Sequence, residues 1–133
     1  MTTKILIVDD FFGILELLHK YFDLKCIKVE IEVCESAMAG LEKMKFQQFD
    51  VIISDYDMRG MNGIEFLKSI RDMGNSTPFV LLTGIQNPEI KIEAEKYGAV
   101  YVQKGEYPTK QFDEIIMVLK KIKKKKVNTE EKA

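Results

Sequence analysis

The sequence contains few of the residues on which several classes of protein depend. It has two cysteines, one histidine and no tryptophan among its 133 residues. Two cysteines are too few for a disulfide framework, and one histidine argues against both a histidine-based metal centre and a Ser-His-Asp triad. No apolar run is longer than five residues, which argues against a membrane span. The N-terminus lacks the apolar stretch of a secretory signal, so we expect a cytoplasmic protein with free thiols.

The residues that are present suit a single globular domain, with 46% apolar and 31% charged side chains. The net charge of −1 hides a segregation: residues 1–119 hold 13 basic and 19 acidic side chains, whereas residues 120–133 hold 7 basic and 2 acidic ones. We interpret the tract Lys120–Lys126 as a solvated helix end whose cations complement the helix dipole. Contact with an anionic membrane surface or non-specific binding of nucleic acid are the alternatives.

Short apolar runs rich in β-branched residues indicate five strands. Four runs do not alternate with polar residues, which is typical of parallel strands covered on both faces: Ile5–Val8, Val51–Ile53, Phe79–Leu82 and Ala99–Val102. A fifth run, Val29–Val33, alternates strictly, so we expect an edge strand with Glu30 and Glu32 in water. Apolar residues at helical spacing predict helices around residues 14–22, 37–44, 64–70, 90–97 and 112–122.

This alternation predicts an α/β fold, a three-layer doubly wound (βα)5 sandwich around a five-stranded parallel sheet. Residues at the expected boundaries agree, with a cap at Ser36, a first-turn proline at Pro88, and terminating glycines at Gly74 and Gly98. An alternating second strand favours the flavodoxin-like strand order 2-1-3-4-5, which places that strand at an edge. Such sheets bind ligands beyond the carboxyl ends of their strands, so we expect the functional site there.

Polar side chains with complementary chemistry follow four of the predicted strands. They are Asp9 and Asp10 after the first strand, Asp55 and Asp57 after the third, Thr83 after the fourth, and Lys104 after the fifth. Converging carboxylates repel one another unless a cation intervenes, and oxygen ligands without histidine or cysteine favour Mg²⁺. A carboxylate can form an aspartyl phosphate, while a lysine and a threonine suit phosphoryl oxygens. The pattern therefore predicts a magnesium-dependent phosphoryl site.

Over residues 4–124 the chain resembles a response-regulator receiver domain, the phospho-acceptor module of two-component signalling. The resemblance rests on the polar residues just given and on the loop Asp55–Gly63. Two positions depart from the family pattern, because Arg59 and Gly105 stand where the family usually has proline. The Thr-Gly and Gln-Lys-Gly sequences after the fourth and fifth strands are similar to those of stand-alone archaeal receivers.

The resemblance implies a phosphorylation chemistry for the acidic residues. Asp55 would accept a phosphoryl group from a sensor histidine kinase or a phosphotransfer protein. Mg²⁺ would be bound by the side chains of Asp10 and Asp55 and by the backbone carbonyl of Asp57, with Asp9 acting through bound water. The carboxylate of Asp57 lies where attacking water would approach the phosphoryl group, so we add the hypothesis that it alters the lifetime of the phosphate.

The resemblance also implies a switch. Lys104 would pair with the phosphoryl oxygens, and Thr83 and Tyr101 would move together when the group is present. The surface formed by the fourth helix, the fifth strand and the fifth helix would then change for a downstream protein partner. We expect no sequence-specific nucleic acid as a partner, and a weak homodimer remains open.

We therefore expect a signalling protein, not an enzyme, that assists only its own phosphorylation and dephosphorylation. Residues 1–124 would form the receiver and residues 125–133 a basic and polar tail, without an output module. The alternative is a haloacid-dehalogenase-like phosphatase with Asp55 as nucleophile. In those enzymes the nucleophile comes first and the acidic pair last, which is the reverse of the order here. His19 could be read as a phosphotransfer histidine, but we interpret it as a surface residue of the first helix.

Overall fold

The computed structural model describes residues 2–9, 15–25, 27–84, 86–104 and 108–132, with the backbone alone for residues 15–19, 108–109 and 123–132. Strands and helices alternate along the whole chain. In chain order they are β1 (Thr3–Val8), α1 (Leu15–Leu24), β2 (Val29–Cys34), α2 (Ala37–Phe46), β3 (Val51–Asp55), α3 (Gly63–Asp72), β4 (Phe79–Thr83), α4 (Pro88–Lys96), β5 (Val100–Gln103) and α5 (Pro108–Lys132). The predicted α/β alternation is confirmed.

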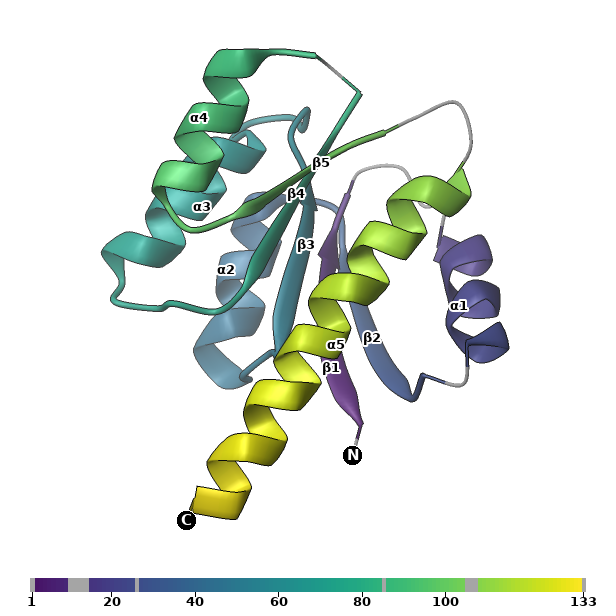
Figure 1. Ribbon diagram of the computed structural model, residues 1–133. Helices are drawn as coiled ribbons and strands as arrows, with labels where there is room; N and C mark the ends of the chain where they lie inside the picture. The colour runs from purple at the N-terminus through teal and green to yellow at the C-terminus, as the bar shows by residue number, and fades with distance from the viewer. Residues whose placement is uncertain (1, 10–14, 26, 85, 105–107, 133) are drawn as a thin grey trace.

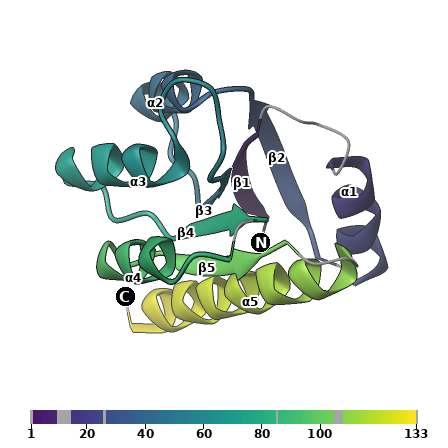
Figure 2. The same cartoon turned by 90° about the horizontal axis from the view of Figure 1, so that it is seen from above.

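The five strands form one parallel sheet in the order β2-β1-β3-β4-β5, which confirms the predicted topology. Helices α2, α3 and α4 cover one face of the sheet, and α1 and α5 cover the other (Figures 1 and 2). Successive side chains of a strand point to opposite faces. Leu6 and Val8 of β1 therefore pack toward α2 and α3, whereas Ile5 and Ile7 pack toward α5. The carboxyl ends of the three central strands meet at one edge of this sandwich.

The helix boundaries follow the local signals in the sequence. Ser36 caps α2, because its hydroxyl accepts a hydrogen bond from the backbone N–H of Ala39 at 3.1 Å. Pro88 stands in the first turn of α4. Gly74 and Gly98 follow α3 and α4 with φ angles of +77° and +78°, a conformation that glycine adopts at little cost. These four boundary predictions are confirmed.

The edge strand β2 is less exposed than its alternating pattern predicted. Glu30 lies in solvent as expected, but the side chain of Glu32 is only 29% exposed and lies 3.7 Å from the ammonium of Lys43. The prediction that both glutamates stay in water is therefore wrong for Glu32, because α2 packs beside this strand and brings Lys43 to it. Cys34, at the end of β2, is a buried free thiol whose pKa is raised to about 11 by burial.

Helix α5 is longer than the apolar spacing of residues 112–122 indicated. It runs from Pro108 to Lys132 and so passes through the lysine tract into residues 125–132. No glycine or proline follows Pro108, and lysine and glutamate are good helix formers, so nothing in the local sequence stops the helix. Its last turns extend past the sheet (Figure 1). Within the part of the chain that the structure describes, no helix is both long and apolar enough to cross a bilayer.

Arg71, near the end of α3, links this helix to the segments that follow α3 and α4. Its guanidinium donates hydrogen bonds to the backbone carbonyls of Tyr97 at 2.8 Å, Asn75 at 3.1 Å and Thr77 at 2.9 Å. We expect Arg71→Lys to lower the free energy of unfolding by about 2 kcal/mol, because one ammonium cannot replace a planar donor group with several directions. Urea denaturation would measure this loss. Arg59→Lys, at an exposed site, is the control, and equal stability of the two variants would contradict the prediction.

Candidate functional site

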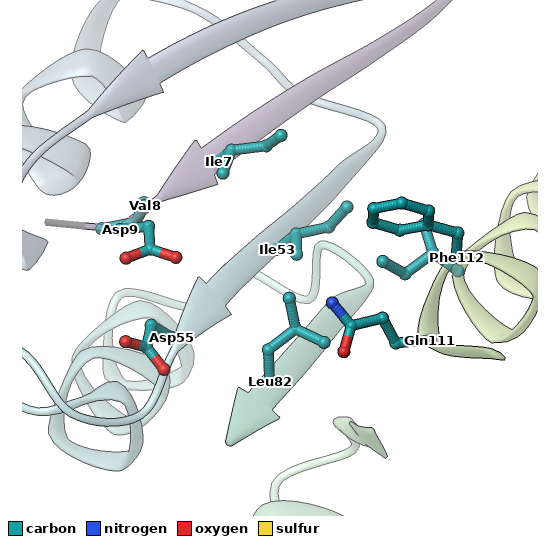
Figure 3. A pocket seen from close by; sticks show the side chains of 9 residues that line it. Ile7, Val8, Asp9, Ile53, Asp55, Leu82, Gln111 and Phe112 are labelled. Atoms are coloured by element: carbon teal, nitrogen blue, oxygen red, sulfur yellow. The ribbon is translucent and has the colours of Figure 1, made fainter. Parts of the chain in front are cut away.

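Two of the predicted acids reach one cavity at the carboxyl ends of the central strands. Asp9 follows β1 and is buried, and Asp55 is the last residue of the neighbouring strand β3. Figure 3 shows both carboxylates beside this cavity, which is small, with a volume of about 20 Å³. The cavity is lined by Ile7, Val8, Asp9, Ile53, Asp55, Leu82, Gln111, Phe112 and Ile115. The topology thus brings together residues that are 46 positions apart in the chain.

Lys104 faces the same carboxylate from the end of β5. Its ammonium lies 3.1 Å from Oδ1 of Asp55, and the two side chains are 31% and 12% exposed. The backbone N–H of Lys104 donates to the carbonyl of Thr83 at 2.8 Å, which anchors the base of this side chain to β4. Because the pair is partly withdrawn from water, its attraction is screened less than that of a surface ion pair. The predicted convergence of Asp55 and Lys104 is present.

Thr83 and Tyr101 lie on the neighbouring strands β4 and β5. Thr83 is buried at the carboxyl end of β4, directly opposite Gln103 in the sheet register. Tyr101 lies two residues earlier on β5 and is half-buried, packed against the core on the α4 side. Its ring borders a surface hollow of about 440 Å³, which is lined by Gln86, Asn87, Pro88, Lys91, Tyr101 and Gln103. A movement of Tyr101 would therefore reshape the surface between α4 and β5.

The loop after β3 is held close to the end of that strand. The N–H of Gly63 donates to the carbonyl of Tyr56 at 2.8 Å, and α3 starts at this glycine with a capping box between Asn62 and Glu65. A Cβ atom on Gly63 would lie 2.5 Å from the carbonyl oxygen of Asp55, which is far too close. Gly63 was not singled out in the sequence. The feature of the sequence that could have pointed to Gly63 is the presence of a glycine in the first helical turn, where residues with better helix propensity are usual.

Gln111, which lines the cavity, is a second residue that the sequence did not single out. It lies in the first turns of α5 and is only 4% exposed. Its position four residues before Ile115 places it on the apolar face of the helix, and this spacing was the available signal. A lone amide at such a position does not reveal from the sequence which cavity it faces.

The donors at this edge suit a hard cation. Asp9 and Asp55 offer carboxylate oxygens, and no histidine or cysteine lines their cavity. Oxygen ligands of this kind are those that Mg²⁺ prefers in proteins. Asp10 lies outside the described residues, and within the described ranges no three acidic, histidine or cysteine side chains lie close enough to form a complete cation site. Asp57, two residues beyond Asp55, has a solvent-exposed side chain.

Comparison with known proteins agrees with this geometry. A family model described as response regulator receiver domain matches residues 5–120. The response regulator ArlR of Staphylococcus saprophyticus is 33% identical over 116 residues, which cover 84% of this chain and 47% of that protein. The receiver domain of the Francisella response regulator 1452 is similar in structure, with a TM-score of 0.78, 26% identity, and coverage of 93% of this chain and 98% of that one.

A further solved structure contains ligands. The response regulator TrrA of Thermotoga maritima in complex with Mg²⁺ and BeF matches with a TM-score of 0.73 and 28% identity, over 90% of this chain and 98% of that chain. The chain spans between 16% and 49% of the length of the first curated relatives that it matches. Because the family model covers nearly the whole sequence, this chain belongs to the response regulator receiver domains of two-component signalling.

Proposed function

We propose that this receiver domain accepts a phosphoryl group on Asp55. The observation that carries the proposal is the pairing of the Asp55 carboxylate with the Lys104 ammonium at 3.1 Å, beside the buried Asp9. A carboxylate oxygen of Asp55 attacks phosphorus, a new P–O bond forms, and the bond from phosphorus to the donor breaks. The donor keeps that electron pair, and Asp55 becomes an acyl phosphate. The attraction of Lys104 for the added phosphoryl oxygens offsets part of the new charge.

Mg²⁺ is the proposed cofactor, held by the side chains of Asp10 and Asp55 and by the backbone carbonyl of Asp57, with Asp9 acting through bound water. Support comes from the carboxylates at the cavity and from the Mg²⁺ and BeF complex of TrrA. When bound, the ion supplies positive charge that neutralises the phosphoryl oxygens. The protein's part is to gather the acids at the ends of adjacent strands, which their mutual repulsion would oppose without a cation.

The signal would leave the site through Thr83 and Tyr101. Once Asp55 carries a phosphoryl group, Lys104 and the Thr83 hydroxyl have new oxygens to bind, and Tyr101 would turn inward behind the threonine. Support comes from the place of Tyr101, which packs on the α4 side of the core and borders the hollow between α4 and β5. The surface that changes would be that of α4, β5 and α5. Its partners would be a histidine kinase or phosphotransfer protein and a downstream protein.

We further propose that residues 1–124 act as the receiver and residues 125–133 as a basic extension, with no turnover of an external substrate. The family match over residues 5–120 supports a signalling role, and no comparison supports the phosphatase alternative. Some curated relatives are themselves enzymes, such as a protein-glutamate methylesterase of Chromobacterium violaceum, of which this chain spans 29%. The methylesterase activity belongs to that relative, and we do not propose it for this chain.

Labelling by a small phosphoryl donor tests the proposed function. We expect incubation with acetyl phosphate and Mg²⁺ to add one phosphoryl group per chain, detected by intact mass spectrometry and removed by hydroxylamine, which cleaves acyl phosphates. The label should fail to form when the cation is chelated. Steady release of phosphate from small phosphomonoesters would support the phosphatase instead, and a chain that takes up no label under any of these conditions would overturn the proposal.

Asp57 is expected to change the lifetime of the phosphate. Its exposed carboxylate, two residues beyond Asp55, would repel hydroxide or misorient water near the phosphoryl group. We therefore expect Asp57→Asn to change the dephosphorylation rate by about threefold to tenfold, as the loss of one nearby charge would. The decay of label after removal of acetyl phosphate measures it. Asp72→Asn, which removes an exposed carboxylate at the end of α3, is the control, and an Asp57→Asn rate equal to that of the control would remove the hypothesis.

A further inference from the structure

Helix α5 continues past the sheet through the most basic segment of the chain. This segment, Lys120–Lys126, contains six lysines and one isoleucine, and we call it the basic arm. It lies inside a helix that runs from Pro108 to Lys132, and the last turns of that helix extend beyond the strands (Figure 1). The first two lysines of the arm, Lys120 and Lys121, are exposed. A continuous helix holds the six charged positions at regular spacing on one short rod.

The lysines of the basic arm have almost no acidic neighbours along their own helix. Residues three or four positions apart are neighbours on a helix, where opposite charges attract and like charges repel. Only Lys126 has an acidic residue at this spacing, which is Glu130. Pairs such as Lys120 and Lys124 are four positions apart and repel each other. An anionic partner would relieve this repulsion, so the charge of the arm points to such a partner.

The positions of the lysines favour a partner that meets the helix on more than one side. Successive residues of an α-helix are about 100° apart around its axis, so six lysines within seven residues occupy all of its sides. A flat membrane surface meets only one side, and helices that lie in a membrane interface need an apolar face there. Ile122 is the one apolar residue of the basic arm, so the arm lacks that face.

The major groove of duplex DNA matches the basic arm in shape and charge. It is about 12 Å wide and admits an α-helix, whose diameter with side chains is about 10–12 Å. Phosphates border the groove on both sides, so lysines on opposite sides of the helix have anionic partners. The major groove of duplex RNA is deep and too narrow for this arrangement. A run of lysine alone also lacks the mixture of side chains that reads different bases.

We propose that the basic arm binds duplex DNA without sequence preference. The rest of the chain opposes such binding, since residues 1–119 hold 19 acidic and 13 basic side chains, and the extension of α5 past the sheet keeps the arm clear of them (Figure 1). Lys123 follows Gln111, which lines the cavity beside Asp55, by 12 residues, or about 18 Å of helix. This exceeds the screening length of about 8–10 Å in physiological salt, so DNA binding is independent of phosphorylation.

Fluorescence anisotropy of a labelled DNA duplex of about 20 base pairs tests the proposal with the full chain. We expect a dissociation constant in the micromolar range at about 0.1 M salt. It should rise with about the fifth power of the salt concentration, because each phosphate contact adds about 0.9 to this exponent. Two duplexes of different sequence should bind within about twofold of each other. Absence of binding at about 0.05 M salt, or an exponent below about 1, would overturn the proposal.

Substitution of four lysines by glutamine separates the basic arm from the overall charge of the protein. Glutamine keeps the helix propensity of lysine and removes its charge. The test variant combines Lys123→Gln, Lys124→Gln, Lys125→Gln and Lys126→Gln. We expect it to bind the duplex at least about 100-fold more weakly at about 0.1 M salt, with an exponent lower by about three to four.

The matched control removes the same number of charges from exposed lysines outside the arm. It combines Lys20→Gln, Lys28→Gln, Lys45→Gln and Lys110→Gln. Because these lysines are scattered over the surface, we expect the control to bind within about fivefold of the unsubstituted protein. Equal losses in the two variants would show that net charge alone governs binding, and the proposed role of the arm would then be wrong.

Other anionic partners are outcomes of the same titration. Tighter binding to phosphatidylserine vesicles than to the duplex, at equal phosphate concentration, would assign the basic arm to a membrane surface instead. Duplex RNA that binds as tightly as DNA would contradict the fit to the major groove. No phosphoryl donor is present in these measurements. Failure of Asp55 to take up a label therefore leaves the DNA test intact, and failure of DNA binding leaves the proposed phosphorylation intact.

Discussion

Asp55→Asn is expected to abolish labelling by acetyl phosphate. The amide has no negative oxygen with which to attack phosphorus, so the rate constant should fall by a factor on the order of 1000 or more. Intact mass spectrometry after incubation with acetyl phosphate and Mg²⁺ measures this directly. The loss should not come from unfolding, because asparagine has nearly the same shape and can still face the Lys104 ammonium. It would also relieve repulsion between Asp55 and the neighbouring Asp9.

The control for this experiment is a carboxylate of the same kind outside the site. Asp72→Asn removes an exposed aspartate at the end of α3 and should label at the normal rate. Urea denaturation should find the free energy of unfolding of Asp55→Asn unchanged or raised, by no more than about 1 kcal/mol. If Asp55→Asn still takes up a stoichiometric, hydroxylamine-sensitive label, the acceptor is another residue, and the role proposed for Asp55 is wrong.

Gly63→Ala is expected to cost about 3 kcal/mol in the free energy of unfolding, the upper range for overpacking a closely packed site. A Cβ atom at this position would lie 2.5 Å from the carbonyl oxygen of Asp55 and 2.6 Å from a methyl group of Leu81. The backbone at the end of β3 cannot yield easily, because Ser54 is paired with both β1 and β4 and Asp55 is paired with β4. The start of α3 must therefore move, or Asp55 must.

This substitution should also reach the chemistry. Any shift of the Asp55 backbone moves its carboxylate away from Lys104, so we expect slower labelling in the folded fraction of Gly63→Ala as well. Gly84→Ala is the matched control for stability, since a Cβ atom there would meet nothing within 4 Å. Urea denaturation of both variants gives the comparison. Equal stability of Gly63→Ala and Gly84→Ala would contradict the close approach of α3 to β3.

The fold was predictable because its signals are local and strong. Buried parallel strands are apolar on both faces, so runs such as Ile5–Val8 and Phe79–Leu82 are distinct from helices in the sequence itself. Ser36 and Pro88 act within one turn of their own helices, and their roles were predicted correctly for the same reason. Glu32 was predicted wrongly because its environment depends on α2, whose packing against β2 does not follow from the alternation of β2.

The candidate site was predictable to the extent that parallel strands end at a common edge. Given the strand order, Asp9 and Asp55 had to lie near each other, and the structure places both at one cavity. Gly63 and Gln111 could not be found in this way. The role of Gly63 depends on how closely the start of α3 approaches β3, where a Cβ atom would lie 2.5 Å from the carbonyl oxygen of Asp55. The place of Gln111 depends on where α5 crosses the sheet.

Sequence by itself determined the order of strands and helices, the topology, and the set of polar residues at the strand ends. These follow from periodicity and from the rule that parallel strands point the same way. Tertiary structure alone decided how the helices sit on that sheet: that α2 shields Glu32, that α3 leaves no room for a side chain at Gly63, and that α5 buries Gln111 at the cavity that Asp9 and Asp55 also line. The physical reason is that periodicity tells which face of a helix is buried, whereas packing between whole elements determines what each buried atom touches.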